Sequence, residues 1–322
     1  MPSPLRMILV RTVLGLGMLL PVSAVIFFAV SLLPGDYATE VLGQQATPES
    51  VARFRETLGL DTPVAQRYVA WLTHAVQGDL GKSYASHEGG ARPVVGIIGE
   101  RLLNTFFLAG VTASVAVPLA VGLGILIALY RDSWVDRLLN SATLAMISCP
   151  EFFLAYVLML LLSVKLNLFY SLAMVDAGTP LSARLLRIAL PVLTLTLVIT
   201  AHMMRMTRTA LISILSHPYI EMARCKGLSP SRIMLRHALP NAWAPIVNVI
   251  AFNLSYLVVG VVVVEVAFAY PGIGQTMVDA VRARDVPVIQ ACALIFAVTY
   301  IVFNLAADLI AIATNPRLMH AT

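Results

Sequence analysis

The chain has 322 residues, of which 59% are hydrophobic and only 12% are charged. Soluble domains contain about 25% charged residues, so this composition excludes an ordinary soluble protein and indicates an integral membrane protein. The net charge of +5 could point to nucleic acid in a soluble protein, but in a membrane protein we expect it to reflect basic cytoplasmic loops and contact with membrane lipid, with no nucleic acid as a partner.

The first region, residues 1–33, contains an apolar segment that is predicted to remain in the membrane. Residues 12–33 carry no charge and exceed the length of a signal-peptide core. They also lack a convincing small-x-small cleavage site. We therefore expect a retained first transmembrane helix.

Residues 34–101 form a long first loop that is predicted to be helical. The segments 47–59 and 62–78 each begin with Thr-Pro, an N-cap threonine before a first-turn proline, and each ends at a glycine. In the second segment, Tyr68 and Trp71 belong to an apolar stripe at helical spacing. We expect this stripe to pack on the membrane domain or to lie at its surface, and a ligand groove is the alternative.

Residues 102–322 hold five more segments with the length and composition of membrane spans. A spanning helix needs about 20 mostly apolar residues. The segments are 102–130, 138–164, 188–204, 242–264 and 286–307. The fold is therefore predicted to be all-α, with six transmembrane helices in total.

The distribution of Lys and Arg predicts the orientation of these helices. With six spans both termini lie on one side, and the short loops on that side carry more basic residues than the short loops opposite. Both termini and the loop 205–241 are therefore predicted to be cytoplasmic, and residues 34–101 to be external.

The cytoplasmic loop leads into a compact basic stretch, YIEMARCKGLSPSRIMLRHALPNAWAPI, at residues 219–246. Pro218 begins a short helix that is predicted to stop at Gly227, and a Ser-Pro pair begins a second helix that should end before Pro240. Such a hairpin is too short to span the membrane. It is either a basic interfacial loop or a rigid docking element for a cytoplasmic partner.

This stretch resembles the cytoplasmic EAA-type loop of ABC importer permeases, in particular the peptide/nickel branch. The resemblance continues through VVVVEVAFAYPGIGQTMVDAVRARDVPVIQ and NLAADLIAIATNPRL toward the C-terminus. Near the N-terminus, LLPGDYA, ATPESVARFRETLGLDTPVAQRYVAWL and GDLGKSY look like the subunit type that has a long external first loop. The departures are small: Tyr37 stands where this subfamily often has proline, and Pro240 where it often has arginine.

The resemblance implies the type I ABC importer architecture in the bacterial inner membrane, with residues 102–322 as the core permease domain. The chain would pair with a second, homologous permease subunit over two ATPase domains, separate or fused. An external solute-binding protein would deliver the substrate. ATP and Mg would bind to the ATPase partners, whereas this chain, which shows no GxxxxGK[ST] motif, would bind no cofactor and hold no catalytic residue.

The hairpin 218–239 would transmit closure of the ATPase domains to the membrane helices. The residues that the resemblance assigns to this coupling are Tyr219, Glu221, Ala223, Arg224, Lys226, Gly227, Leu228, Arg232, Arg236, His237, Leu239 and Pro240. In the external loop, Tyr68 and Trp71 would help to contact the binding protein.

Carboxylates at membrane depth are the remaining candidate site residues. Glu151 lies well inside a predicted span, where a charge costs roughly 2.5–3.5 kcal/mol on insertion scales, so we expect it either to hydrogen-bond another helix or to lie near the translocation pathway. Glu265 ends the fifth span just before YPGIG, and with Pro271, Gly272 and Gly274 it is expected to belong to the outer gate. The cysteines show no CxxC or CxxH spacing, so no metal site is expected.

The expected substrates are peptides, from dipeptides to oligopeptides, and the alternatives within the same architecture are nickel complexes and glutathione. The scarcity of charge along the spans favours a pathway for varied side chains over one for a bare ion. A secondary transporter would be expected to show inverted repeats and broken helices, and a membrane enzyme a nucleophile–base pair or a metal cluster. Neither pattern is evident in the sequence.

Overall fold

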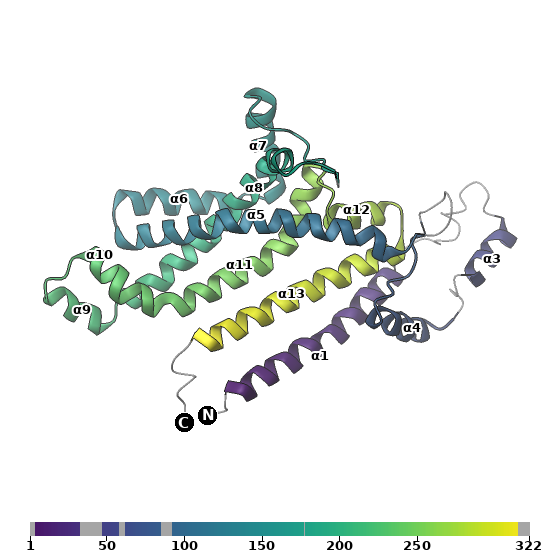
Figure 1. Cartoon of the computed structure of the whole chain (residues 1–322), viewed down its shortest axis with the longest axis horizontal. Coiled ribbons are helices and arrows are strands. Elements are labelled where there is room, and N and C mark those ends of the chain that lie inside the picture. Colours follow the sequence, from purple (N-terminus) through teal and green to yellow (C-terminus); the bar gives the residue numbers. More distant parts are fainter. Residues whose placement is uncertain (1–3, 33–46, 58–61, 85–91, 177, 315–322) are drawn as a thin grey trace. The chain divides into compact units, whose positions relative to one another are not determined.

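The computed structural model describes residues 4–32, 47–57, 62–84, 92–176 and 178–314. Over these ranges the chain forms α-helices, short π-helical segments and one isolated bridge between Lys82 and Pro93, which confirms the predicted all-α fold. The elements, shown in Figure 1, are α1 Pro4–Ser31, α3 Pro48–Thr57, α4 Val64–Val76, α5 Val94–Leu129, α6 Trp134–Ser148, α7 Glu151–Leu158, η2 Met159–Lys165, α8 Leu181–Leu215, α9 Pro218–Cys225, α10 Pro230–Ile233, η3 Met234–Ala238, α11 Leu239–Ala267, α12 Ile273–Arg282 and α13 Val286–Thr314.

The helices form two compact units, each of which is described by itself. The first unit comprises Met1–Gly15, Thr105–Pro271 and Thr299–Thr322, and the second comprises Leu16–Asn104 and Gly272–Val298. The helices α1, α5 and α13 therefore contribute residues to both units.

Five helices of the described residues are long and apolar enough to cross a membrane by themselves: Ile8–Ser31, Val94–Leu129, Leu181–Leu215, Pro230–Val258 and Val286–Ile310. A sixth crossing is formed if Trp134–Ser148 and Glu151–Lys165 count as one span, but these two helices meet at an angle of 105°. The predicted third span, 138–164, is therefore broken, and Figure 1 shows α7 turning away from α6.

Pro150 explains the break in the third span. A proline has no backbone N–H to donate and disfavours helical backbone at the residue before it. Cys149 accordingly takes an extended conformation, with φ −88° and ψ 130°, and α7 starts afresh at Glu151. The sequence analysis predicted one span here, because hydrophobicity does not reveal this change of direction.

The fourth span is longer than predicted. The apolar segment 188–204 lies within α8, which runs from Leu181 to Leu215. Arg187 and Arg205, which bound the apolar segment, do not end the helix, because arginine is a good helix former. The long side chain of an arginine also reaches partners beyond the apolar core. Further out on the same helix, Arg184 and Arg208 make such contacts toward its two ends.

The core of the first unit lies between α5, α8 and α11. Its fully buried members include Ala116 and Ala120 of α5, Met203 of α8 and Val261 of α11. Small residues on α5 let the helix backbones approach closely. At Gly124 the approach leaves no room for a side chain, since an added Cβ would lie 2.7 Å from the Cβ of Thr207 on α8.

In the second unit, the predicted starts and stops of the loop helices are mostly confirmed. The Ser50 N–H donates to the Thr47 hydroxyl over 3.2 Å, the N-cap bond expected for α3. At the end of α4, Gly78 has φ +85° and its N–H donates to the Ala75 carbonyl, as the glycine stop requires. One detail differs: Pro63 is itself the N-cap residue of α4 and not its first helical residue. The predicted stop at residue 59 lies outside the described residues.

The second helix of the basic hairpin does not end before Pro240, as the sequence had predicted. It begins at Pro230, passes through the π-helical segment η3 and continues as α11 to Ala267. In the π-helical segment η3 each backbone hydrogen bond spans five residues instead of four. Pro240, which follows η3, has no N–H to donate, and the wider turn allows the helix to continue past it. The hairpin therefore consists of one short helix, α9, and the first turns of a membrane-spanning helix.

Candidate functional site

The short helix α9 has the predicted start and stop. Pro218 occupies its first position after His217, and Gly227 ends it with φ +74°. The Gly227 N–H donates to the Arg224 carbonyl over 2.9 Å, and the Leu228 N–H donates to the Ala223 carbonyl over 3.3 Å. These two bonds make the Schellman motif, in which a residue with positive φ reverses the chain after the last helical turn.

One face of α9 is buried against the ends of three longer helices. Ile220 is fully buried and Ala223 is nearly so, and both belong to a cluster with Ala128 of α5, Leu211 of α8 and Ala242 of α11. Burial of one side chain the size of Ile220 contributes about 1.5–3 kcal/mol. The cluster thus ties the direction of α9 to α5, α8 and α11 together.

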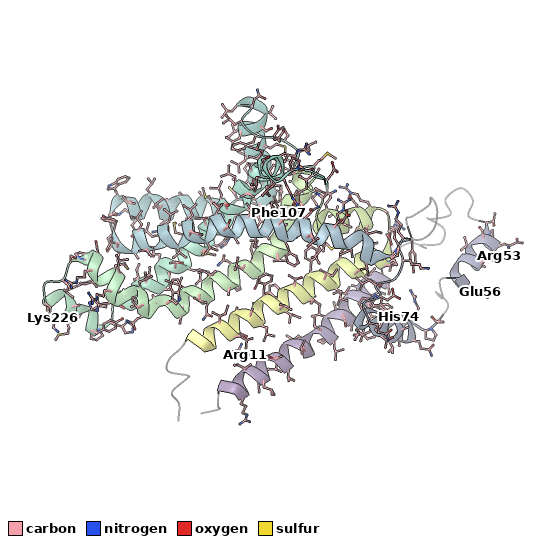
Figure 2. All side chains as sticks on the ribbon, in the orientation of Figure 1. Arg11, Arg53, Glu56, His74, Phe107 and Lys226 are labelled. Carbon is pink, nitrogen blue, oxygen red and sulfur yellow. The ribbon has the colours of Figure 1, made fainter. Side chains whose placement is uncertain are left out.

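The opposite face of α9 is open to solvent. Beside the exposed Met222 and Cys225, this side presents one aromatic ring, one carboxylate and two basic groups: Tyr219, Glu221, Arg224 and, at the C-cap, Lys226. Figure 2 shows Lys226 at the tip of the hairpin that α9 and α10 form. We call these four residues the exposed face of α9.

The structure divides the predicted coupling residues by position. Those that pack into the hairpin, wholly or in part, are Ala223, Leu228 and Leu239. Those with exposed side chains outside α9 are Arg232, Arg236 and Pro240, whereas His237 is half-buried. Only the exposed members are free to meet another protein, and the packed members hold the helix in place.

α6 and α8 share an ion pair that the sequence analysis did not identify. The Arg208 guanidinium donates from Nε to Oδ1 of Asp136 over 2.8 Å and from a terminal nitrogen to Oδ2 over 2.7 Å. The side chains are 22% and 5% exposed, respectively. The Asp132 N–H also donates to Asp136, over 3.0 Å. This bidentate pair joins α8 to the start of α6.

Glu151 is hydrogen-bonded to another helix, which is one of the two predicted alternatives, and it also lines a cavity. The Tyr256 hydroxyl of α11 donates to its Oε1 over 2.8 Å. The same carboxylate lines a cavity of about 360 Å³ between the α6–α7 break, α8 and α11. A place on the translocation pathway stays a prediction.

Glu265 is fully buried near the end of α11. The Thr105 hydroxyl of α5 donates to its Oε1 over 2.6 Å. Tyr270 lies close by, and burial raises the pKa of its phenol. The Glu265 carboxylate raises this pKa further, whereas a hydrogen bond with Arg184 lowers it. Arg184 also lies 4.1 Å above the ring of Phe107, which Figure 2 labels on α5. Glu265 thus lies in a buried polar cluster that links α5, α8 and the segment after α11.

The three other predicted gate residues lie where that segment turns into α12. Pro271 precedes the turn, Gly272 is the N-cap residue of α12, and Gly274 is buried in its first turn. The Thr276 hydroxyl donates to the Gly272 carbonyl over 2.8 Å. These contacts give the turn a defined structure, and its role as a gate stays a prediction.

Tyr68 and Trp71 pack on the first helix within the second unit. The Tyr68 hydroxyl shares a hydrogen bond of 2.9 Å with the Ser23 hydroxyl, and both rings lie within 5.6 Å of the Phe27 ring, centroid to centroid. The packing that the sequence favoured for this stripe is therefore present. Contact of the two residues with a binding protein stays a prediction.

Two stretches that are far apart in the sequence meet in the same unit. The Ser83 hydroxyl donates to the Asp285 carboxylate, and the Tyr84 N–H donates to it over 3.2 Å. Ser83 and Asp285 are both buried. They belong to GDLGKSY and VRARDVPVIQ, which were each recognised by resemblance but gave no sign of contact in the sequence.

Comparison with known proteins agrees with this arrangement. Residues 120–320 match the family described as binding-protein-dependent transport system inner membrane component, and residues 4–108 match the N-terminal component of the same systems. The chain belongs to this family. That membership confirms the resemblance to ABC importer permeases, and the chain is accordingly the membrane permease component of an importer that works with ATPase and binding-protein partners.

Several relatives of this permease component match over nearly the whole chain. The glutathione transport system permease protein GsiC of Pectobacterium atrosepticum is 36% identical over 312 residues, which cover 97% of this chain and 98% of the relative. The protein of that name from Escherichia coli K12 has the same identity and coverage. The one from Salmonella typhimurium is 36% identical over 302 residues.

A solved structure shows the fold of the permease component independently. The MetNI methionine ABC transporter in inward-facing conformations matches with a TM-score of 0.57 over 69% of this chain and 97% of the matched chain. The sequences are only 19% identical, so this likeness concerns the fold alone.

Proposed function

We propose that this permease subunit imports peptides, from dipeptides to oligopeptides, and that α9 transmits the work of ATP hydrolysis to its membrane helices. The GsiC relatives are named as glutathione transport permeases, and glutathione is itself a tripeptide that falls within this class. Nickel complexes are the second substrate class for the same architecture.

The two-sided structure of α9 is the observation that carries the coupling role. Its inner residues, Ile220 and Ala223, are packed among the ends of α5, α8 and α11. Its outer residues, Arg224 and Lys226 among them, are exposed. A partner that moves the outer face would move the packed inner face with it, because close-packed interfaces change by discrete rigid shifts and do not deform smoothly.

The proposed assembly contains a second, homologous permease subunit, two ATPase domains and an external solute-binding protein. ATP and Mg bind to the ATPase domains, and the exposed face of α9 lies against them in the cytoplasm. Both termini are on that side of the bacterial inner membrane. α4, with Tyr68 and Trp71, is on the external side, where the binding protein delivers the substrate.

A charge reversal on the exposed face of α9 tests the docking role. Arg224→Glu inverts one of its two basic groups without touching the buried cluster, so the ATPase is expected to co-purify with the tagged permease at least about tenfold less than with wild type. The amount of permease in the membrane should not change. The matched control is Arg131→Glu, an exposed arginine in the turn between α5 and α6. Equal retention of the ATPase by both variants would contradict the docking role.

A further inference from the structure

The cavity at the helix break between α6 and α7 has the composition of a binding site. It measures about 360 Å³, within the usual range for small-molecule sites, and it lies entirely in the first unit. Its wall combines apolar side chains, among them Met146 and Phe152 from the two sides of the break, with polar groups from Glu151, His202 and Tyr256. Apolar side chains combined with a few fixed polar groups are typical of ligand recognition.

The Glu151 carboxylate is held at a defined position in this cavity. It is the first residue of α7, and the Tyr256 hydroxyl donates to Oε1 over 2.8 Å. Gly260, one turn further along α11, leaves space beside the carboxylate: an added Cβ would lie 3.7 Å from Oε2. A side chain at position 260 would therefore lie against the carboxylate, which glycine leaves uncovered on this side.

Aromatic groups face the same space as the carboxylate. The His202 and Tyr256 rings lie 6.4 Å apart, centroid to centroid, at an angle of 49°. A carboxylate beside aromatic rings and a thioether can stabilise an organic cation by a charge-assisted hydrogen bond and by cation–π contact. A bare divalent metal ion would need several oxygen or nitrogen ligands around it, whereas Glu151 supplies the one carboxylate among the residues that line this cavity.

We infer that this cavity recognises the free ammonium group of the transported substrate, with Glu151 as the binding group and Tyr256 as the residue that positions it. The inference rests on the proposed function and deepens it. Peptides and glutathione both carry a free α-ammonium group, so one site serves either substrate. A substrate whose amine is acylated would lose the ion pair and leave the carboxylate unpaired.

The native Cys149 offers a direct test of binding, because it lines the same cavity and is half-buried. In a Cys225→Ser, Cys292→Ala background, the reconstituted complex is treated with N-ethylmaleimide, and modification of Cys149 is followed by mass spectrometry. Millimolar alanyl-alanine is expected to slow the modification, and N-acetyl-alanyl-alanine is not. Glu151→Gln, which keeps the shape and removes the charge, is expected to abolish this difference.

Two outcomes of the labelling would overturn the inference. Equal protection by both dipeptides, or a difference that persists in Glu151→Gln, would show that the carboxylate does not recognise the amine. Complete protection of Cys149 in the assembled complex without any peptide would show that a neighbouring subunit fills the cavity.

Uptake separates this inference from the proposed function. With the same binding protein and ATPase throughout, Glu151→Gln is expected to reduce ATP-dependent uptake of alanyl-alanine about tenfold, and Tyr256→Phe to reduce it less, because the charge remains. The matched control is Glu100→Gln, an exposed carboxylate on α5. Wild-type uptake in Glu151→Gln would overturn the inference alone, whereas a wild-type complex that imports no peptide with ATP would overturn the proposed function.

Discussion

Three carboxylates each meet a polar partner on another helix. Asp136 accepts two hydrogen bonds from Arg208, Glu151 accepts one from Tyr256, and Glu265 accepts one from Thr105. A charge buried in an apolar setting is costly unless it is paired and hydrogen-bonded. At the residue scale these contacts explain how charged groups are tolerated between apolar helices.

The ion pair between Asp136 and Arg208 gives the clearest prediction at this scale. Arg208→Met leaves a buried carboxylate, only 5% exposed, without its charged partner. We expect a loss of about 3–5 kcal/mol in the free energy of unfolding, which is typical for breaking one side of a buried pair. The thermal unfolding midpoint of the purified protein in detergent measures the loss.

A surface pair provides the control for this prediction. Arg11 and Asp308 lie 2.6 Å apart, but their side chains are 54% and 40% exposed. Asp308→Asn should cost less than about 1 kcal/mol, because solvent screens such pairs. The double variant Arg208→Met, Asp136→Leu should regain much of the lost stability, since it removes both charges. Similar losses from Arg208→Met and Asp308→Asn would contradict the buried pair.

At the scale of elements, the sequence predicted what depends on local chemistry. The glycine after α9 and the threonine before α3 act within one turn of chain, and both were placed correctly. The break at Pro150 and the continuous passage through η3 were missed. Both concern a proline, and a single sequence does not reveal whether a proline breaks a helix, as Pro150 does, or lies within one, as Pro240 does.

The same distinction holds for the candidate site. The resemblance assigned Ala223 and Arg224 to one coupling surface, but the structure buries the first and exposes the second. The contact between Asp136 and Arg208 joins residues 72 positions apart. No local pattern encodes such a pair, although a lone aspartate beside an apolar run is a signal that could have suggested a buried partner.

Gly227 supports a prediction at the element scale. Its φ of +74° and the open space around it mean that a new side chain would meet backbone strain and no clash. Gly227→Val should cost about 1–2 kcal/mol locally, which is enough to tilt or fray α9 and too little to prevent insertion of the long helices. We expect normal amounts of complex, with ATP hydrolysis that no longer responds to loaded binding protein.

Gly78 is the matched control for that variant. It also has a positive φ, +85°, with open space around it, and it ends α4 by the same motif. Gly78→Val introduces the same strain away from α9, so the ATPase should still co-purify with the permease. Normal stimulated hydrolysis in Gly227→Val would mean that the α9 hairpin is only an interfacial linker.

At the scale of the whole molecule, the excess of basic residues in the short loops on one side predicts that α4 and α10 lie on opposite sides of the membrane. Single cysteines that replace Gln66 and Ser231 test which side of the membrane each helix lies on. Both positions are exposed, and the native cysteines are removed from the background. An impermeant maleimide added to intact cells should label the cysteine at position 66 and reach position 231 only after the membrane is opened. Labelling of both from outside would reverse the orientation.

The central claim is that ATP on the α9 side drives peptide movement from the α4 side through this subunit. Accumulation of labelled dipeptide in proteoliposomes tests it most directly, with the permease subunits and the ATPase reconstituted together. The account predicts that the dipeptide accumulates only with ATP on the α9 side and binding protein on the α4 side. Gly227→Val should abolish this accumulation. Accumulation without ATP, or driven by an ion gradient alone, would contradict it.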